Sequence, residues 1–330
     1  MPSKPFLSAT NFINYYSQTD RKIKLIDSVI VTTVALVRIK ISTIRHLMRF
    51  IRISKIENDF VENAICSHPI ELLVVCGPED FAILPSCIKS VLQFSCNPIS
   101  KIVVIVREQD VEIVKKQIVE TNTFGKVTIS IINENDFIPL KVRSKLEQKF
   151  QKRYGWVLQQ LIKVSYVSES QAKAVLVMDA DTVLLQPFKG LDDSGNQHLS
   201  YSSEMQRSYR KFLKYIGVPV KRPYFSTVTH HMIIQPMIMR ELLRTIGMQD
   251  LNKLTDRIAL FNCKPRVSPV SIDYEMYGQY LRSRHSNKIN FASFSNRPSV
   301  RSLEALQEVE EILLGNTFSG FRSISFHRYL

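Results

Sequence analysis

Two aspartates, Asp179 and Asp181, stand two positions apart at the end of an uninterrupted apolar run, Ala174 to Met178. Alternate residues of an extended chain point the same way, so both carboxylates can meet one cation, directly or through water. Mg²⁺ and Mn²⁺ take carboxylate ligands, and substrate phosphates and water can complete their shell. The pattern therefore predicts a divalent-metal site for a phosphate-bearing substrate. A turn or a helix cap is the alternative that the same residue types allow.

The elements expected around this pair predict an α/β fold. The run 174–178 lacks alternation, as is typical of a strand buried on both faces of a parallel sheet. Earlier segments alternate between strand and helix patterns, with strands over 71–76, 101–106 and 127–132 and helices over 84–94 and 110–119. This order predicts a mainly parallel sheet with right-handed crossovers. Such sheets bind ligands at the carboxyl ends of their strands, where Asp179 and Asp181 fall.

Further polar residues lie on elements on either side of the pair. A helical stretch over 143–168 carries Lys163 and leads into the aspartate strand. Beyond the aspartates we expect a strand over 199–205, a helix over 209–216, a strand over 225–234 and a helix over 237–247. His230 and His231 alternate faces on an extended segment, so at most one of them faces a cleft.

Another helix is expected to begin near residue 271. Ser271 is a plausible N-cap, with Asp273 and Glu275 in the first turn, where the helix dipole favours carboxylates. These two carboxylates therefore have a structural explanation beside any catalytic one.

The balance of charge favours an anionic partner. The 330 residues are 45% hydrophobic and 22% charged, with a formal net charge of +14. A nucleotide, a nucleic acid or a membrane surface would all satisfy this excess. Residues 1–60 hold ten Lys or Arg and four Asp or Glu, and they predict a basic helical extension. Its segment 34–56 is expected to contact an anionic membrane surface, with a solvated helix packed on the domain as the alternative.

Several classes of site and of protein are disfavoured. Five scattered cysteines form no C-x-x-C pair, which predicts reduced thiols in a cytosolic setting and no zinc site. The beginning of the sequence lacks the pattern of a signal peptide, and we expect a cytoplasmic protein. No G-x-G-x-x-G follows the first strand and no P-loop motif is present, which disfavours a dinucleotide site and a P-loop nucleotide site.

Four segments together resemble the GT-A glycosyltransferase superfamily. They are Val74-Val75-Cys76-Gly77-Pro78-Glu79-Asp80, Gly155-Trp156 with Gln159-Gln160 and Lys163, Met178-Asp179-Ala180-Asp181-Thr182-Val183, and Asp273-Tyr274-Glu275 with Tyr277-Gly278. More narrowly, they are similar to a bacterial group of glycosyltransferase-like proteins that is described as a domain of unknown function. The resemblance covers roughly residues 70–330.

The resemblance implies a GT-A-like single domain over 61–330, with a Rossmann-like nucleotide-binding sheet. A donor half over about 70–190 would bind a nucleoside diphosphate sugar, and an acceptor half over about 191–330 would bind a glycan or lipid-linked acceptor. The implied protein builds a cell-surface polysaccharide at the inner face of the cell membrane.

The resemblance also implies roles for single residues. Asp179 and Asp181 would hold Mn²⁺ or Mg²⁺ against the donor diphosphate, and His327 would be a third metal ligand. Gly77 and Asp80 would meet the nucleoside, and Lys163 would add a charge to the diphosphate.

The resemblance also bears on the catalytic base of the reaction. Asp273 or Glu275 would be the catalytic base of an inverting reaction, whereas a retaining reaction would not need that base, and both outcomes stay open.

Other functions also stay open. A sugar nucleotidyltransferase would share the sheet and the acidic metal site, but it should carry a glycine-rich loop where this chain has Gly77-Pro78-Glu79-Asp80. A non-catalytic protein with a GT-A-like fold is a further alternative. A nucleic-acid-binding protein should show a basic face interleaved with exposed aromatics. The basic residues look dispersed along the sequence, so we expect no nucleic acid partner.

Overall fold

The protein is described by a computed structural model that covers residues 66–121, 127–202, 207–222, 224–261, 270–293, 295–300, 302–315 and 321–327. The expected extension over 1–60, with the basic segment 34–56, lies outside the described residues. None of the helices in the described part is long and apolar enough to cross a bilayer.

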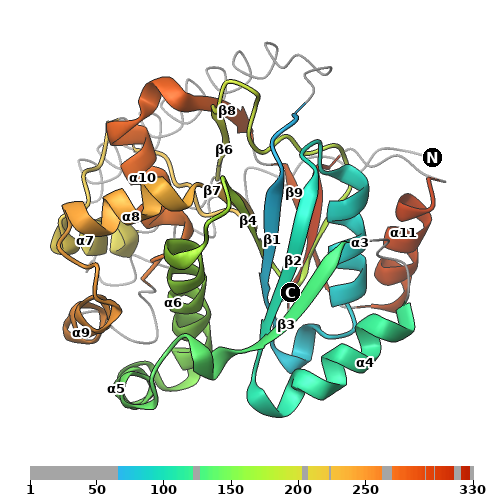
Figure 1. The fold of residues 1–330 in the computed structure, drawn as a ribbon, viewed down its shortest axis with the longest axis horizontal. Coiled ribbons are helices and arrows are strands. Elements are labelled where there is room, and N and C mark those ends of the chain that lie inside the picture. The colour runs from blue at the N-terminus through green and yellow to red at the C-terminus, as the bar shows by residue number, and fades with distance from the viewer. Residues whose placement is uncertain are drawn as a thin grey trace, which may run out of the picture. The chain divides into compact units, whose positions relative to one another are not determined.

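A five-stranded sheet forms the centre of the fold, with the strand order β3-β2-β1-β4-β7 (Figure 1). Its strands are β1 (Ile70–Val75), β2 (Ile99–Val106), β3 (Thr128–Asn133), β4 (Val175–Asp179) and β7 (His231–Ile234). The first four are parallel and β7 is antiparallel to β4. The α/β fold with a mainly parallel sheet, expected from the sequence, is thereby confirmed.

Helices cover both faces of this sheet because alternate side chains of each strand point to opposite sides. Leu72 and Val74 pack toward α3 (Leu84–Phe94) and α4 (Val111–Thr121). Leu73 and Val75 pack toward α6 (Tyr154–Glu169). All four side chains are buried, and burying each is worth roughly 1.5–3 kcal/mol.

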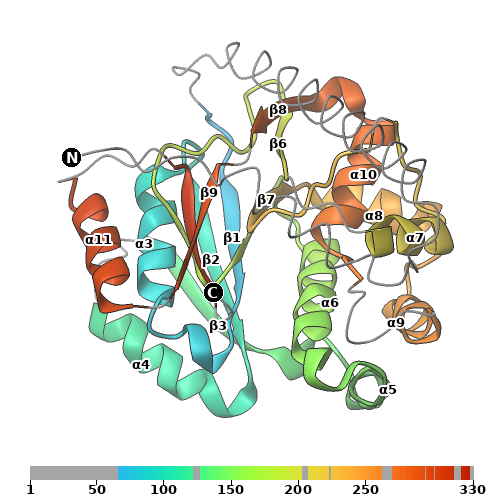
Figure 2. The same ribbon diagram turned by 180° about the vertical axis from the view of Figure 1, so that it is seen from behind.

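The second face is completed by helices from the later part of the chain. They are α5 (Leu140–Phe150), α7 (Arg207–Ile216), α8 (Pro236–Thr245), α9 (Leu251–Leu260) and α10 (Tyr274–Arg284). Figures 1 and 2 show these helices with α6 on one side of the sheet, and α3, α4 and α11 (Leu303–Leu313) on the other.

Two smaller sheets flank the central one. β6 (Gln197–Tyr201) pairs in parallel with β8 (Ile289–Ser293). The other sheet has the order β5-β10-β9, from β5 (Thr182–Leu184), β10 (Ser323–His327) and β9 (Asn296–Val300). Since β5 follows the aspartate pair directly, this sheet brings the last described strand to the strand end where the carboxylates lie.

Two elements differ from the sequence expectation. The helix expected over 143–168 is two helices, because Gln151 has a φ of 47° and ends α5. A 3-10 turn, η4 (Gln151–Arg153), then leads into α6. The strand expected over 225–234 is shortened to β7 because Ser226 and Thr227 use their polar groups to bind Glu275. The amide of Thr227, which donates to Glu275, is therefore not available to a neighbouring strand.

Candidate active site

The carboxyl ends of β1 and β4 meet at one edge of the central sheet. In the register of the two strands, Asp179 lies opposite Val75. Gly77 and Asp80 follow β1 in the turn that contains the 3-10 helix η1 (Pro78–Asp80). The predicted nucleoside residues and the predicted metal residues are therefore on the same edge, as the parallel topology requires.

Asp179, Asp181 and His230 form a cluster that can hold a cation. One ligand atom from each lies within 4.8 Å of the other two. His230 reaches the cluster because β7 runs antiparallel to β4, and the amide of Asp179 donates to the carbonyl of His230 at 2.9 Å. The imidazole Nδ1 of His230 lies 3.2 Å from Oδ2 of Asp179.

His327 comes to the same cluster from the far end of the chain. β10 pairs with β5 so that Ser325 faces Thr182, and the amide of Phe326 donates to the carbonyl of Asp181 at 2.9 Å. Nδ1 of His327 then lies 3.8 Å from Oδ2 of Asp181. The rings of His230 and His327 are 5.0 Å apart between centroids, so His327 lies beside the group formed by Asp179, Asp181 and His230 and next to Asp181.

A buried lysine holds the first carboxylate. Nζ of Lys163 donates to Oδ1 of Asp179 at 2.5 Å and to Oδ2 of Asp273 at 3.2 Å. The hydroxyl of Tyr274 donates to the same Oδ1 of Asp179 at 2.9 Å. Lys163 is only 2% exposed. Oδ1 of Asp179 thus accepts two hydrogen bonds. The other oxygen, Oδ2, faces His230.

The two aspartates differ in their electrostatics. Burial would raise the pKa of Asp179, but the charge of Lys163 and the hydrogen bond from His230 outweigh burial, and the pKa lies well below its usual range. Burial and the neighbouring charge of Asp179 raise the pKa of Asp181. Asp181 thus carries the less compensated negative charge, which a bound cation would stabilise.

Lys163 keeps its positive charge despite its burial. Desolvation would lower the pKa of Lys163, and the charges of Asp179 and Asp273 together raise it. Three carboxylates and one ammonium group leave a formal charge of −2 on the cluster of Lys163, Asp179, Asp181 and Asp273. A divalent cation would neutralise this charge.

Asp273 and Glu275, the candidate bases, have different surroundings. Asp273, rather than the expected Ser271, is the N-cap of α10, and its Oδ1 accepts from the amide of Tyr274 at 2.8 Å. Glu275 is 0% exposed. Its carboxylate accepts hydrogen bonds from the side chains of Tyr224, Ser226, Thr227 and Gln279 and from the amide of Thr227. Burial raises the pKa of both carboxyls. Asp273 is joined to Asp179 through Lys163, whereas Glu275 lies in a separate hydrogen-bond network.

A glycine allows α10 to approach this network closely. A Cβ atom at Gly278 would overlap the side chain of Thr227. Thr227 in turn donates to the carbonyl of Tyr274 at 3.0 Å. The contact between Gly278 and Thr227 therefore sets the position of the helix that carries Asp273 and Tyr274.

His230 and His231 point to opposite sides, as the alternation of side chains along a strand requires. His231 is buried and packs edge-on against Phe188, with ring centroids 5.0 Å apart, and burial lowers its pKa to about 4. His230 points to Asp179. The sequence showed that at most one of the two could face a site, but the choice between them depends on the register of β7.

Tyr274 was not singled out from the sequence. Its contact with Asp179 joins residues 95 positions apart. No local sequence pattern predicts such a contact.

The residues present fit a divalent cation. The donor set combines two carboxylates with imidazole nitrogens, and the ligand atoms of three residues are already gathered. Mg²⁺ takes oxygen ligands, whereas imidazole suits transition metals.

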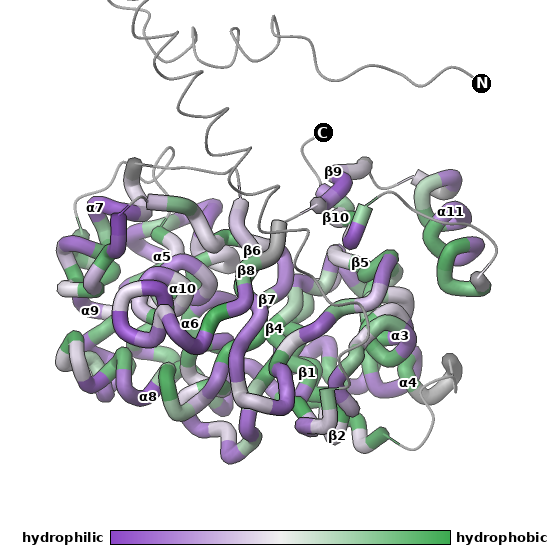
Figure 3. Tube along the Cα trace, turned by 90° about the horizontal axis from the view of Figure 1, so that it is seen from above, coloured by the Kyte–Doolittle hydropathy of each residue, from purple (hydrophilic) through white to green (hydrophobic). Residues whose placement is uncertain are grey.

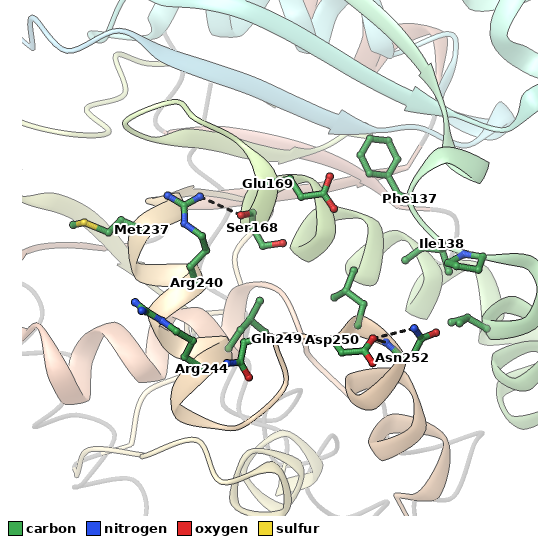
Figure 4. A pocket seen from close by; sticks show the side chains of 14 residues that line it. Phe137, Ile138, Ser168, Glu169, Met237, Arg240, Arg244, Gln249, Asp250 and Asn252 are labelled. Carbon is green, nitrogen blue, oxygen red and sulfur yellow. Dashed lines mark hydrogen bonds between the residues drawn. The ribbon is translucent and has the colours of Figure 1, made fainter.

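A separate pocket of about 680 Å³ lies between α5, α8, α9 and the end of α6 (Figure 4). None of its lining residues belongs to the aspartate cluster. Arg240, at its wall, donates to the carbonyls of Ser168 and Ser170 at 3.1 and 3.0 Å. This arginine thus caps the C-terminus of α6, where backbone carbonyls need donors.

Comparisons with known proteins give limited matches. A model for a family of unknown function (DUF6492) matches residues 78–218. No curated protein matches the chain.

Two solved structures are similar over most of the chain. The apo form of mouse xyloside xylosyltransferase 1 is 12% identical, with a TM-score of 0.42, over 79% of this chain and 98% of that one. Galactosyltransferase LgtC in complex with donor and acceptor sugar analogues is 14% identical, with a TM-score of 0.40, over 79% of this chain and 90% of that one.

Proposed function

We propose that this protein is a metal-dependent glycosyltransferase that transfers a sugar from a nucleoside diphosphate sugar. The observation that carries the proposal is the group of Asp179, Asp181 and His230, with His327 next to Asp181, at the carboxyl edge of a parallel sheet. The turn with Gly77 and Asp80 lies on the same edge. The resemblance to the GT-A superfamily joins these two features in one site for a nucleotide and its diphosphate.

In this proposal Asp179, Asp181, His230 and His327 hold Mn²⁺. A bound divalent cation would neutralise the charge that develops on the departing nucleoside diphosphate. Asp179 would offer Oδ2 alone, because Lys163 and Tyr274 occupy Oδ1. Partners of this kind orient metal ligands and tune their affinity.

The role of Lys163 is revised in this proposal. Its ammonium group is buried between Asp179 and Asp273, so we assign it to holding Asp179 in place, in contrast to the direct contact with the diphosphate expected from the resemblance. It would also reduce the repulsion among the carboxylates of Asp179, Asp181 and Asp273.

Of the two candidate bases, Asp273 is the one we retain for the acceptor side. It lies in the cluster, and its raised pKa is of the kind that general bases show. Glu275 accepts hydrogen bonds from five donors in a separate network that does not contact Asp179 or Asp181, which favours a structural role.

The test is hydrolysis or transfer of nucleoside diphosphate sugars, measured across a donor panel with and without Mn²⁺. We expect one donor class to be turned over by the wild type with Mn²⁺, and activity to be lost in Asp181→Ala. The exposed Asp136 offers a matched control, since Asp136→Ala should retain activity. A folded wild type that neither binds nor hydrolyses any donor would refute the proposal.

A further inference from the structure

Three segments that lie far apart in the sequence are strongly basic. The segments 140–153, 207–222 and 251–260 together hold 14 of the 44 Lys and Arg residues and 2 of the 30 Asp and Glu residues. They therefore carry +12 of the formal net charge of +14, and the other 290 residues carry only +2. These segments are thus basic regions of the chain in addition to residues 1–60.

The basic residues are arranged along helices that share one flank. On α5, Lys141, Lys145 and Lys149 recur at the spacing of one helix face, and Lys152 follows in η4. On α7, Arg210, Lys211 and Lys214 are exposed, while the apolar side chains Tyr209, Phe212, Leu213 and Ile216 are buried beneath them. On α9, Lys253 and Arg257 are exposed one turn apart.

Contacts between the three helices make these stripes one surface. Nζ of Lys145 on α5 lies 2.6 Å from Oδ1 of Asp256 on α9. The guanidinium of Arg257 on α9 lies over the ring of Tyr215 on α7, 5.6 Å from its centroid. Figures 1 and 3 show α5, α7 and α9 on the flank opposite to α3, α4 and α11. We call the exposed side of α5, η4, α7 and α9 the basic face.

Exposed apolar side chains accompany the charges. Leu140 begins α5 and is 74% exposed, Leu260 ends α9 and is 73% exposed, and Tyr215 is 38% exposed. Leucines among lysines and arginines are the composition of surfaces that lie on anionic bilayers, where apolar side chains enter the acyl boundary and cations meet headgroups. Nucleic acid surfaces instead present aromatic rings for stacking, and the ring of Tyr215 is already in contact with Arg257 and Phe261.

We propose that the basic face docks this protein on a membrane that contains anionic lipids. The surface lies within the described domain and is distinct from the N-terminal segment 34–56 expected from the sequence to contact a membrane. The proposal does not depend on the glycosyltransferase proposal, because it concerns lipid binding in the absence of any donor.

The test is co-sedimentation of the full chain with vesicles of phosphatidylcholine alone or of equimolar phosphatidylcholine and phosphatidylglycerol. We expect binding only to the anionic vesicles, with a strength that falls as salt is added. The double variant Lys211→Glu and Lys214→Glu should lower the partition coefficient by at least about thirtyfold. Lys115→Glu with Lys116→Glu is the matched control, since both lysines are exposed on α4 on the opposite flank, and it should bind as the wild type does.

Two further variants keep the test decisive. Lys141→Glu with Lys152→Glu should weaken binding in the same way without altering α7. Leu140→Ser with Leu260→Ser should reduce the binding that persists at high salt. The proposal is wrong if neutral vesicles bind equally well, or if the basic-face variants bind as the control does. It is also wrong if these variants lose affinity for a single-stranded oligonucleotide while their binding to vesicles is unchanged.

Discussion

Lys163 and Asp179 form an ion pair with 2.5 Å between Nζ and Oδ1, in which Asp179 is partly exposed and Lys163 is one of the largest side chains buried in the described part of the protein. Lys163 also pairs with the buried Asp273 at 3.2 Å, and removing one partner of a buried pair leaves an uncompensated charge. We therefore expect Lys163→Met to lower the free energy of unfolding by about 3–5 kcal/mol, measured by urea unfolding.

The matched control for this pair is Lys145→Met. Lys145 also forms a lysine–aspartate pair, but its side chain is 47% exposed. Exposed pairs contribute about 0–1 kcal/mol, so this variant should stay close to the wild type. Equal losses in the two variants would contradict the role assigned to Lys163.

Asp181 is expected to bind the metal and to lower the stability of the metal-free protein. Its pKa is raised by burial and by the charge of Asp179, so Asp181→Asn should stabilise the metal-free protein by about 1 kcal/mol, because it removes a repulsive charge. Mn²⁺ should raise the melting temperature of the wild type and leave that of the variant unchanged. Thermal unfolding with and without Mn²⁺ tests both, and a variant that Mn²⁺ stabilises fully would argue against the proposed ligand.

The hydroxyl of Tyr274 should matter for metal affinity. It donates to Oδ1 of Asp179, and loss of such a partner commonly weakens metal binding by about 10–100-fold. Tyr274→Phe should therefore raise the dissociation constant for Mn²⁺, measured by titration calorimetry. Tyr166→Phe removes a hydroxyl bonded to Glu71, away from the cluster, and should leave that constant unchanged.

Two glycine substitutions should have opposite effects. Gly278→Ala places a Cβ atom against Thr227 and should destabilise by about 1–3 kcal/mol, as overpacking does. Gly155→Ala in α6 meets nothing within 4 Å and should stabilise by about 0.4–1 kcal/mol by reducing the freedom of the unfolded chain. Urea unfolding of both variants gives the comparison. A neutral Gly278→Ala would show that α10 can shift without cost.

A histidine remote from the cluster should make stability depend on pH. Burial lowers the pKa of His198 from 6.5 to about 4, while Asp192 acts to raise it and Lys189 and Arg322 to lower it. Between these two values the unfolded chain binds the proton more strongly than the folded protein does. The contribution of His198 is therefore complete above pH 6.5 and is lost as the pH falls toward 4.

Replacing this histidine removes its share of the pH dependence. In His198→Gln the free energy of unfolding should fall less steeply between about pH 7 and pH 5 than in the wild type. His231, with a pKa lowered to about 4, should leave part of the slope in place. Identical slopes in the two proteins would show that His198 is as easily protonated when folded as when unfolded.

The order of elements around the aspartates could be predicted from the sequence because it depends on local patterns. Apolar runs without alternation marked the buried strands, and helical spacing marked the helix over Leu84–Phe94, whose bounds are confirmed. The position of Asp179 at a strand end followed from the end of its apolar run. Local pattern also explains the error over 143–168, since nothing in the composition signalled the left-handed Gln151.

What surrounds the aspartates was decided by tertiary structure. The β7 register selected His230 over His231, and the pairing of β10 with β5 brought His327 to Asp181. Lys163 was expected to be available to a ligand, but packing buried it against Asp179. Likewise, three segments far apart in sequence became one basic face only when α9 packed between α5 and α7. Local sequence specifies where a strand or helix forms, whereas contacts between distant elements depend on registers and packing that no short segment encodes.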